Sequence, residues 1–221
     1  MRLKKFLASA LVAAPCLVAV QAQAGIVAVT GMAQQIAAPA SVVVNAGLQS
    51  DTIAYVFSEQ QGVTLASAVS VDATASGTYT TVGGLTPGLI SMGTRIDSYY
   101  LHADRVGIPT AFLAFSGSIE FDTDILGVAA QVSVLNTTSF LGAAGTNYGG
   151  IGGLELSNQD RFTISADRRT LTFAFSSSDG ADDLRIITAA ARAVPEPGTV
   201  GLVFTMLGAL ALVRRKAAQR A

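Results

Sequence analysis

The chain has 221 residues, of which 50% are apolar and 13% charged, with 22 glycines and no tryptophan. This length allows one ordinary domain plus targeting segments, and low charge with many small and β-branched residues favours an extracellular β-protein over a cytosolic helical one. Residues 25–193 hold seven arginines, no lysine and 14 acidic residues, a formal charge of −7. This balance argues against nucleic acid as a partner, because phosphate contacts need clustered cations.

Residues 1–24 have the parts of a secretory signal peptide in the expected order. Basic residues precede an apolar stretch over residues 6–20, and Ala22 and Ala24 supply the small-x-small pattern that signal peptidase accepts. A transmembrane helix is disfavoured because the stretch is short and Pro15 interrupts it. We therefore expect cleavage after Ala24.

The only cysteine, Cys16, lies inside this apolar stretch. Lipidation would need a cysteine at the cleavage point after a small residue, whereas Pro15 precedes Cys16. Cleavage after Ala24 leaves a mature protein without cysteine, which excludes disulfides, thiolate catalysis and cysteine-based metal sites.

Between the two ends, apolar residues alternate with polar or small ones, and turn residues separate the segments. This pattern predicts strands over 41–44, 52–57, 63–71, 77–82, 98–101, 111–121, 127–135, 161–165, 170–175 and 184–187. A turn is expected at 167–169, and the glycine-rich segment 142–153 is expected to be a long loop. Many short strands without long helical patterns predict one all-β domain over residues 25–193, an antiparallel β-sandwich of jelly-roll type. We expect an N-terminal signal helix and a C-terminal hydrophobic helix to flank it.

A second signal occupies residues 194–216, and a short tail, 217–221, follows it. Pro195 and Pro197 flank Glu196 and cannot continue a helix or a central strand, so this motif is an extended hinge. The apolar run that follows predicts a helix of about 22 Å, shorter than the roughly 30 Å core of a bilayer. The run is closed by a basic cluster, expected on the cytoplasmic side, of Arg214, Arg215 and Lys216.

This order of Pro-Glu-Pro motif, apolar helix and basic tail resembles the PEP-CTERM sorting signal of Gram-negative bacteria. The resemblance implies that exosortase, a membrane protease-transpeptidase, recognises the three parts together and cuts the chain near Pro195. It implies an inner-membrane intermediate and a final place at the cell surface or in the extracellular matrix. A retained single-pass anchor is the alternative, and both interpretations place residues 25–193 outside the cytoplasm.

The body is also similar, from about residue 95 to 188, to a domain that recurs among uncharacterised PEP-CTERM proteins. The similarity is carried by the segments 98–107, 117–122, 125–128, 153–156, 167–171 and 182–187. It implies a class of exported protein and no particular ligand.

Enzymatic chemistry has little support in these residues. His102 is the only histidine, no Gly-x-Ser-x-Gly motif occurs, and we expect His102 to form structural hydrogen bonds. Glu120 and Asp122 would share a face of one strand, as a pair of carboxylates for glycoside hydrolysis requires, but no tryptophan provides a platform for sugar rings. We therefore expect no enzyme and no cofactor, with a secreted hydrolase as the least favoured alternative.

Calcium is the one metal that this composition suits, since it binds oxygen ligands. Two acidic turns are weak candidates, although neither has EF-hand spacing; they contain Asp122, Asp124, Asp179, Asp182 and Asp183. Overall, we expect an exported surface or matrix protein that is structural or associated with exopolysaccharide or biofilm. A carbohydrate- or calcium-dependent binding module is the alternative, and its expected sign is a concave face with clustered tyrosines, chosen from Tyr55, Tyr79, Tyr99, Tyr100 and Tyr148.

Overall fold

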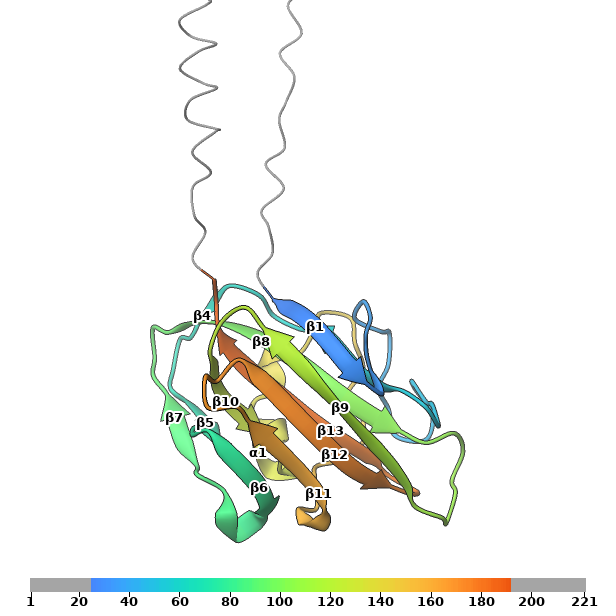
Figure 1. The fold of residues 1–221 in the computed structure, drawn as a ribbon. Helices are drawn as coiled ribbons and strands as arrows, with labels where there is room; N and C mark the ends of the chain where they lie inside the picture. Colours follow the sequence, from blue (N-terminus) through green and yellow to red (C-terminus); the bar gives the residue numbers. More distant parts are fainter. Residues whose placement is uncertain (1–24, 192–221) are drawn as a thin grey trace, which may run out of the picture.

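The computed structural model describes residues 25–191, which form two β-sheets packed face to face (Figure 1). In spatial order, the five-stranded sheet consists of β1 (Ile26–Gly31), β9 (Leu113–Phe121), β12 (Thr170–Ser177), β11 (Ser157–Ile164) and β6 (Gly77–Thr81). The six-stranded sheet consists of β10 (Ile125–Ala129), β13 (Ala181–Ala189), β8 (Arg95–Asp104), β3 (Ala54–Ser58) and β2 (Ala33–Gln35), with β4 (Val63–Thr64) paired to β8.

The remaining elements are short. β5 (Val69–Val71) and β7 (Gly88–Ile90) form a two-stranded sheet, and there is one α-helix, α1 (Val132–Thr137), with 3-10 turns η1 (Val82–Gly84) and η2 (Ser139–Leu141). The paired strands run antiparallel except β2 and β3, which are parallel. The predicted all-β class is thus confirmed for residues 25–191.

The main core lies between the two large sheets, because alternate residues of each strand point inward. On one side it contains Phe115 and Phe173, and on the other Leu101 and Ile186, all at most 1% exposed. Burying each such side chain contributes roughly 1.5–3 kcal/mol relative to leaving it exposed.

The six-stranded sheet is also covered on its outer face. One cluster packs β5 and β7 against Ile96 and Ile187, and another packs α1 and neighbouring loops against Phe57 and Tyr100. The two sheets therefore differ: the six-stranded sheet is buried on both faces, whereas the five-stranded sheet buries one.

Several predicted strands are confirmed, with shifted ends. The segments 52–57, 77–82, 111–121 and 170–175 coincide with β3, β6, β9 and β12, while 98–101 and 184–187 are the centres of the longer β8 and β13. The hairpin turn is also present, and Arg168 adopts the left-handed conformation there with φ 60°. The loop expected over 142–153 contains no helix or strand.

Three expectations were wrong. Residues 41–44 do not form a strand; Ser41 makes one isolated bridge, and Val42 is buried in the cluster that contains Phe57 and Tyr100. The segment 63–71 is divided into β4 and β5. The strand expected over 127–135 ends at Ala129, where an Asp72 carboxylate oxygen accepts the next two backbone N–H groups, at 2.7 and 2.8 Å, and the chain turns into α1.

The helices expected at the signal peptide and over residues 199–213 lie outside the described residues. Within residues 25–191, no helix has the length and apolar character needed to cross a membrane.

Candidate functional site

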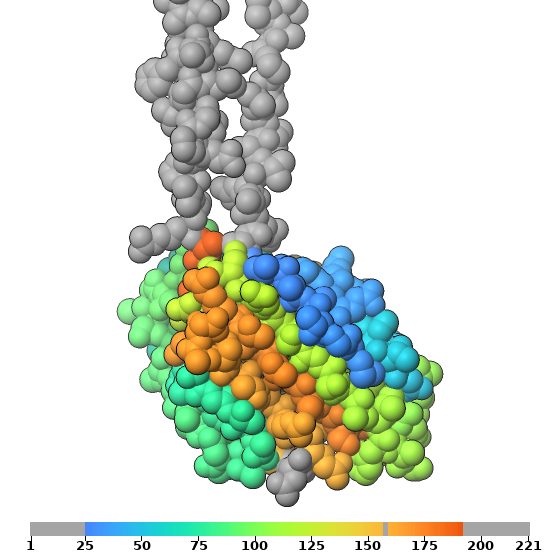
Figure 2. All heavy atoms as spheres, in the orientation of Figure 1, coloured from blue at the N-terminus to red at the C-terminus, as the bar shows by residue number. Residues whose placement is uncertain are grey.

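The outer face of the five-stranded sheet is open to solvent over its central strands. In Figure 2, β1, β9, β12, β11 and β6 run diagonally across the surface as adjacent bands. The outward side chains of β12 are small or hydroxylic, while its inward ones, such as Phe173, belong to the core.

A row of five hydroxyl side chains crosses this face, one from each strand. Register pairs connect them in sequence: Thr30 with Ser118, Ser118 with Thr172, Thr172 with Thr163, and Thr163 with Thr78. Neighbouring strands lie about 4.8 Å apart, so the row is roughly 19 Å long and perpendicular to the strands. We call these five residues the hydroxyl row.

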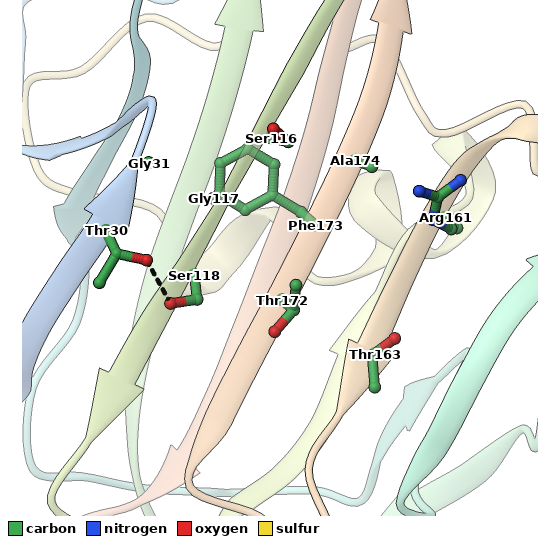
Figure 3. Close-up of a pocket in the computed structure, with 10 residues that line it drawn as sticks. All are labelled: Thr30, Gly31, Ser116, Gly117, Ser118, Arg161, Thr163, Thr172, Phe173 and Ala174. Atoms are coloured by element: carbon green, nitrogen blue, oxygen red, sulfur yellow. Dashed lines mark hydrogen bonds between the residues drawn. The ribbon is translucent and has the colours of Figure 1, made fainter.

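Hydrogen bonds join four of the five hydroxyls of the row into two pairs, and Thr172 lies between the pairs. The hydroxyls of Thr30 and Ser118 lie 2.8 Å apart, and those of Thr78 and Thr163 lie 2.9 Å apart. Thr172, on the central strand, is exposed and lies between Ser118 and Thr163 (Figure 3). Each hydroxyl can both donate and accept, so the row presents repeated groups of both kinds.

An open depression of about 430 Å³ lies beside the row, and Gly31 and Gly117 are among its lining residues. Gly31 and Gly117 are register partners there, and Gly31 has a φ of 67° that disfavours other residues. A side chain on Gly117 would approach the Thr30 carbonyl oxygen to 2.5 Å and the Phe173 ring to 3.0 Å. Gly117 belongs to the inward row of β9, so a side chain there would disturb the packing of β1 and Phe173 beneath the depression.

Arg161 provides a cation at the margin of the depression (Figure 3). It is exposed, and among the described residues it forms no ion pair. Glu120 lies on the same outward face of β9, two residues from Ser118. The outward residues of β9, β11 and β12 therefore include one charge of each sign and the amide of Gln159, and the others described are hydroxylic or small.

The outer face of the six-stranded sheet carries a buried polar network. His102 Nδ1 lies 2.7 Å from Asp183 Oδ1, and His102 Nε2 lies 3.0 Å from the carbonyl oxygen of Leu48. Burial alone would lower the pKa of His102, but the hydrogen bond and charge of Asp183, with a contribution from Asp104, raise it. These two contacts are the structural hydrogen bonds expected of His102, and the residue is 0% exposed.

The acidic candidates of the sequence are separated by the fold. Asp122 and Asp124 lie in the turn between β9 and β10, whereas Asp179 lies in the turn between β12 and β13 and Asp182 follows it at the start of β13. Asp183 is the partner of His102. Within residues 25–191, no three histidine, cysteine, aspartate or glutamate side chains are grouped so as to hold a metal ion.

The tyrosines do not form an exposed platform. Tyr79, Tyr99 and Tyr100 are at most 3% exposed, and Tyr148 packs edge-on against Tyr100 at 5.1 Å between ring centroids. The tyrosine cluster that would mark a sugar-binding module is therefore not seen among residues 25–191, and Tyr55 lies apart as a half-buried residue of β3.

The sorting and processing residues lie outside the described residues. They are Ala22, Ala24, Pro195, Glu196, Pro197, Arg214, Arg215 and Lys216.

The hydroxyl row was not among the predicted sites. Strand alternation alone places Ser118 and Thr172 on outward faces, but only strand register places them side by side. Comparisons with protein-family models, curated proteins and solved structures find no match to this chain.

Proposed function

We propose that this protein is an exported, non-enzymatic surface or matrix protein whose sandwich binds exopolysaccharide through the hydroxyl row. The row carries the proposal because it is a repeated, uncovered set of donors and acceptors on a regular face. Export is supported by the sequence of residues 1–24, and sorting by exosortase is supported by the motif at residues 195–197.

An extended polysaccharide suits the chemistry of this face. A polymer laid across the strands would present sugar hydroxyls to consecutive members of the row. One hydrogen bond contributes only about 0.5–1.5 kcal/mol after exchange with water, so a single sugar would bind weakly. Repeated contacts along one chain raise the overall affinity, because each later contact is intramolecular.

Arg161 suggests that the face prefers polysaccharides that carry carboxylate groups. Its guanidinium can form a two-point contact with a sugar carboxylate beside the hydroxyl row. The formal charge of −7 on residues 25–193 opposes a polyanion at long range, but physiological salt screens charges beyond about 8 Å. We therefore propose that uronate-bearing polysaccharides bind at least as well as neutral ones.

We also propose that the β-sandwich is a jelly roll, and its topology is consistent with this. β8 pairs with β13 and β9 pairs with β12, which is the nested pairing that such folds use. A hydrolase is disfavoured because both nitrogens of His102 already have structural acceptors.

Binding to polysaccharide extracted from the producing cells tests the proposal. We expect saturable binding of the purified protein, and a loss of at least tenfold in affinity for the double variant Thr172→Val/Thr163→Val. Valine keeps the shape and strand preference of threonine while removing the hydroxyl. Thr64→Val is the matched control, since Thr64 is an exposed strand residue of the other large sheet. Equal binding by the double variant and the control would contradict the role of the row.

A further inference from the structure

A second cavity, of about 290 Å³, lies where β7 of the two-stranded sheet meets β10 and the turn between β11 and β12. Figure 1 shows β5, β7 and β10 together on one side of the sandwich. The cavity shares no lining residue with the depression beside the hydroxyl row. Ligand pockets usually measure about 300–1,000 Å³, so this cavity has room for a small ligand.

Arg168 provides the charged side chain among the residues that line this cavity. It is half-buried, its Nε–H donates to the carbonyl oxygen of Ile125 at 3.0 Å, and its Nη2 group donates to the Ile125 and Leu126 carbonyl oxygens. These partners are neutral, and within residues 25–191 Nη1 has no partner and Arg168 forms no ion pair. A partly desolvated cation without a counter-charge favours an anion beside it.

The backbone holds Arg168 in place before any ligand binds. Its φ of 60° lies in the left-handed region, which arginine rarely adopts and which glycine or asparagine tolerate. The Arg168 N–H donates to the Ser165 carbonyl oxygen at 2.9 Å, and the Ile125 N–H donates to the Arg168 carbonyl oxygen at 2.7 Å. An anion therefore meets a guanidinium that is already positioned, which lowers the entropy cost of binding.

The neighbouring cation of the same turn has different surroundings. Arg169 is exposed, and its Nε lies 3.7 Å from a carboxylate oxygen of Asp124. It is not among the residues that line the cavity. Of these two adjacent arginines, Arg169 therefore has a counter-charge at the surface, whereas Arg168 faces the cavity without one.

Hydroxyl and apolar side chains complete the cavity. Ser91 and Thr94 belong to the turn between β7 and β8, in which the Thr94 N–H donates to the Ser91 carbonyl oxygen at 3.2 Å. Neither side-chain hydroxyl makes a hydrogen bond within the described part of the chain, so both are available to a ligand. Apolar contacts are provided by Leu89, Ile90 and Leu126. A sugar acid has the matching groups, namely a carboxylate, ring hydroxyls and an apolar C–H face.

We propose that this cavity binds a single sugar acid, with Arg168 on the carboxylate and Ser91 and Thr94 on the ring hydroxyls. A guanidinium donates charge-assisted hydrogen bonds to a carboxylate, which a neutral sugar does not offer. The proposal rests on the proposed function for its ligand class, and it gives a uronate, free or at the end of a polymer, a place separate from the hydroxyl row. One charge-assisted contact in an open cavity supports weak binding, with an expected dissociation constant of about 1–10 mM.

Saturation-transfer NMR on the full chain in non-ionic detergent tests the site, with D-glucuronate as the probe. We expect saturable transfer to glucuronate, at least tenfold weaker binding of D-glucose, and poor competition by sulfate at equal ionic strength. Arg168→Asn should lower the affinity for glucuronate at least tenfold, because asparagine accepts the left-handed backbone but lacks the guanidinium. Ser91→Ala/Thr94→Val should lower it about three- to tenfold while leaving Arg168 in place.

Arg169→Asn is the matched control, since it removes the adjacent cation of the same turn, and it should bind glucuronate as the wild type does. Arg161→Gln and Thr172→Val/Thr163→Val should also retain this binding, so failure of this site is distinguishable from failure of the hydroxyl row. A disaccharide ending in glucuronate separates the two sources: binding as tight as that of glucuronate indicates a chain end, and weaker binding indicates the free acid. The proposal is overturned if glucuronate shows no saturable transfer, if glucose or sulfate binds equally well, or if Arg168→Asn binds as well as Arg169→Asn.

Discussion

Arg185 and Glu59, 126 residues apart in the sequence, form a two-point ion pair with no solvent exposure. Arg185 Nε lies 2.7 Å from Glu59 Oε2, and Nη2 lies 2.8 Å from Oε1. Arg185 Nη1 donates to the carbonyl oxygen of Leu135 and the hydroxyl of Thr138, and the Tyr100 ring lies 5.2 Å away. This pair therefore connects α1 and the segment after it to the outer face of the six-stranded sheet.

Breaking this pair should destabilise the fold strongly. Arg185→Met leaves the Glu59 carboxylate buried without a counter-charge, and we expect a loss of about 3–5 kcal/mol in the free energy of unfolding. The double variant Arg185→Met/Glu59→Leu removes both charges and should recover most of that loss. Urea unfolding of the three proteins measures both effects. A double variant less stable than Arg185→Met would contradict this account.

Asp182 should make stability fall as pH rises. Burial, followed by the charges of Asp160 and Asp183, raises the pKa of Asp182 from 3.8 to about 8. The folded state then keeps a proton that the unfolded state releases, so the free energy of unfolding decreases between about pH 4 and pH 8. Asp182→Asn should flatten this decrease and be most stabilising at pH 8. The exposed Asp179→Asn should leave the pH profile unchanged, and urea midpoints across the window provide the measurement.

His102 should be an imidazolium in the folded protein. Its two ring nitrogens face the Asp183 carboxylate and the Leu48 carbonyl oxygen, both acceptors, so both nitrogens must donate. Because the folded pKa is raised above 6.5, this contribution to stability is fully present below pH 6.5 and is lost as pH rises through the folded pKa. Nitrogen chemical shifts of the ring should show the doubly protonated form at pH 6.5. A neutral ring at that pH would refute the assignment.

Gly117→Ala should disturb the sheet beneath the hydroxyl row. The new methyl group would meet a backbone oxygen of Thr30 and the Phe173 ring, neither of which moves easily. We expect a cost of about 1–3 kcal/mol, typical of overpacking. Gly83→Ala is the control, since a side chain there meets no atom within 4 Å. Equal urea midpoints for the two variants would show that β1 can shift without cost.

The sorting proposal has its own test. Replacing Pro195, Glu196 and Pro197 with alanine should leave an uncut, membrane-held precursor in the producing cell. Fractionation followed by immunoblotting distinguishes this precursor from the processed form. Replacing Gln159 and Arg161 in the body should leave processing unchanged. Normal processing of the triple variant would remove the exosortase part of the proposal.

The alternation of apolar and polar residues in the sequence was sufficient to predict the hairpin of β11 and β12. There, Phe162 and Phe173 alternate with polar residues, and a short polar turn separates the two runs. The same alternation failed at residues 132–135, because the Asp72 carboxylate, about 60 positions earlier, holds the backbone where the strand ends. It also failed at 41–44, where Val42 lies in a loop and is buried in the cluster that contains Phe57 and Tyr100.

The candidate site could not be predicted because it depends on register between distant segments. Thr30 and Ser118 are 88 positions apart, and a shift of one residue would send one of the two hydroxyls to the opposite face. The buried tyrosines show the opposite case, in which residues adjacent in the sequence are separated by the fold. Tyr99 and Tyr100 are adjacent in the sequence and point to opposite faces of β8, so they cannot form one platform.

The two ends of the described chain lie close together in space. Gly25 accepts a hydrogen bond from Asp122, and Asp124 accepts one from Ala189, so both ends meet the same turn (Figure 1). A tether continuing from either end would therefore attach to a single pole of the domain. The strands run obliquely away from that pole (Figure 1), so such a tether would leave the hydroxyl row, which crosses the middle of the strands, free to meet a polymer.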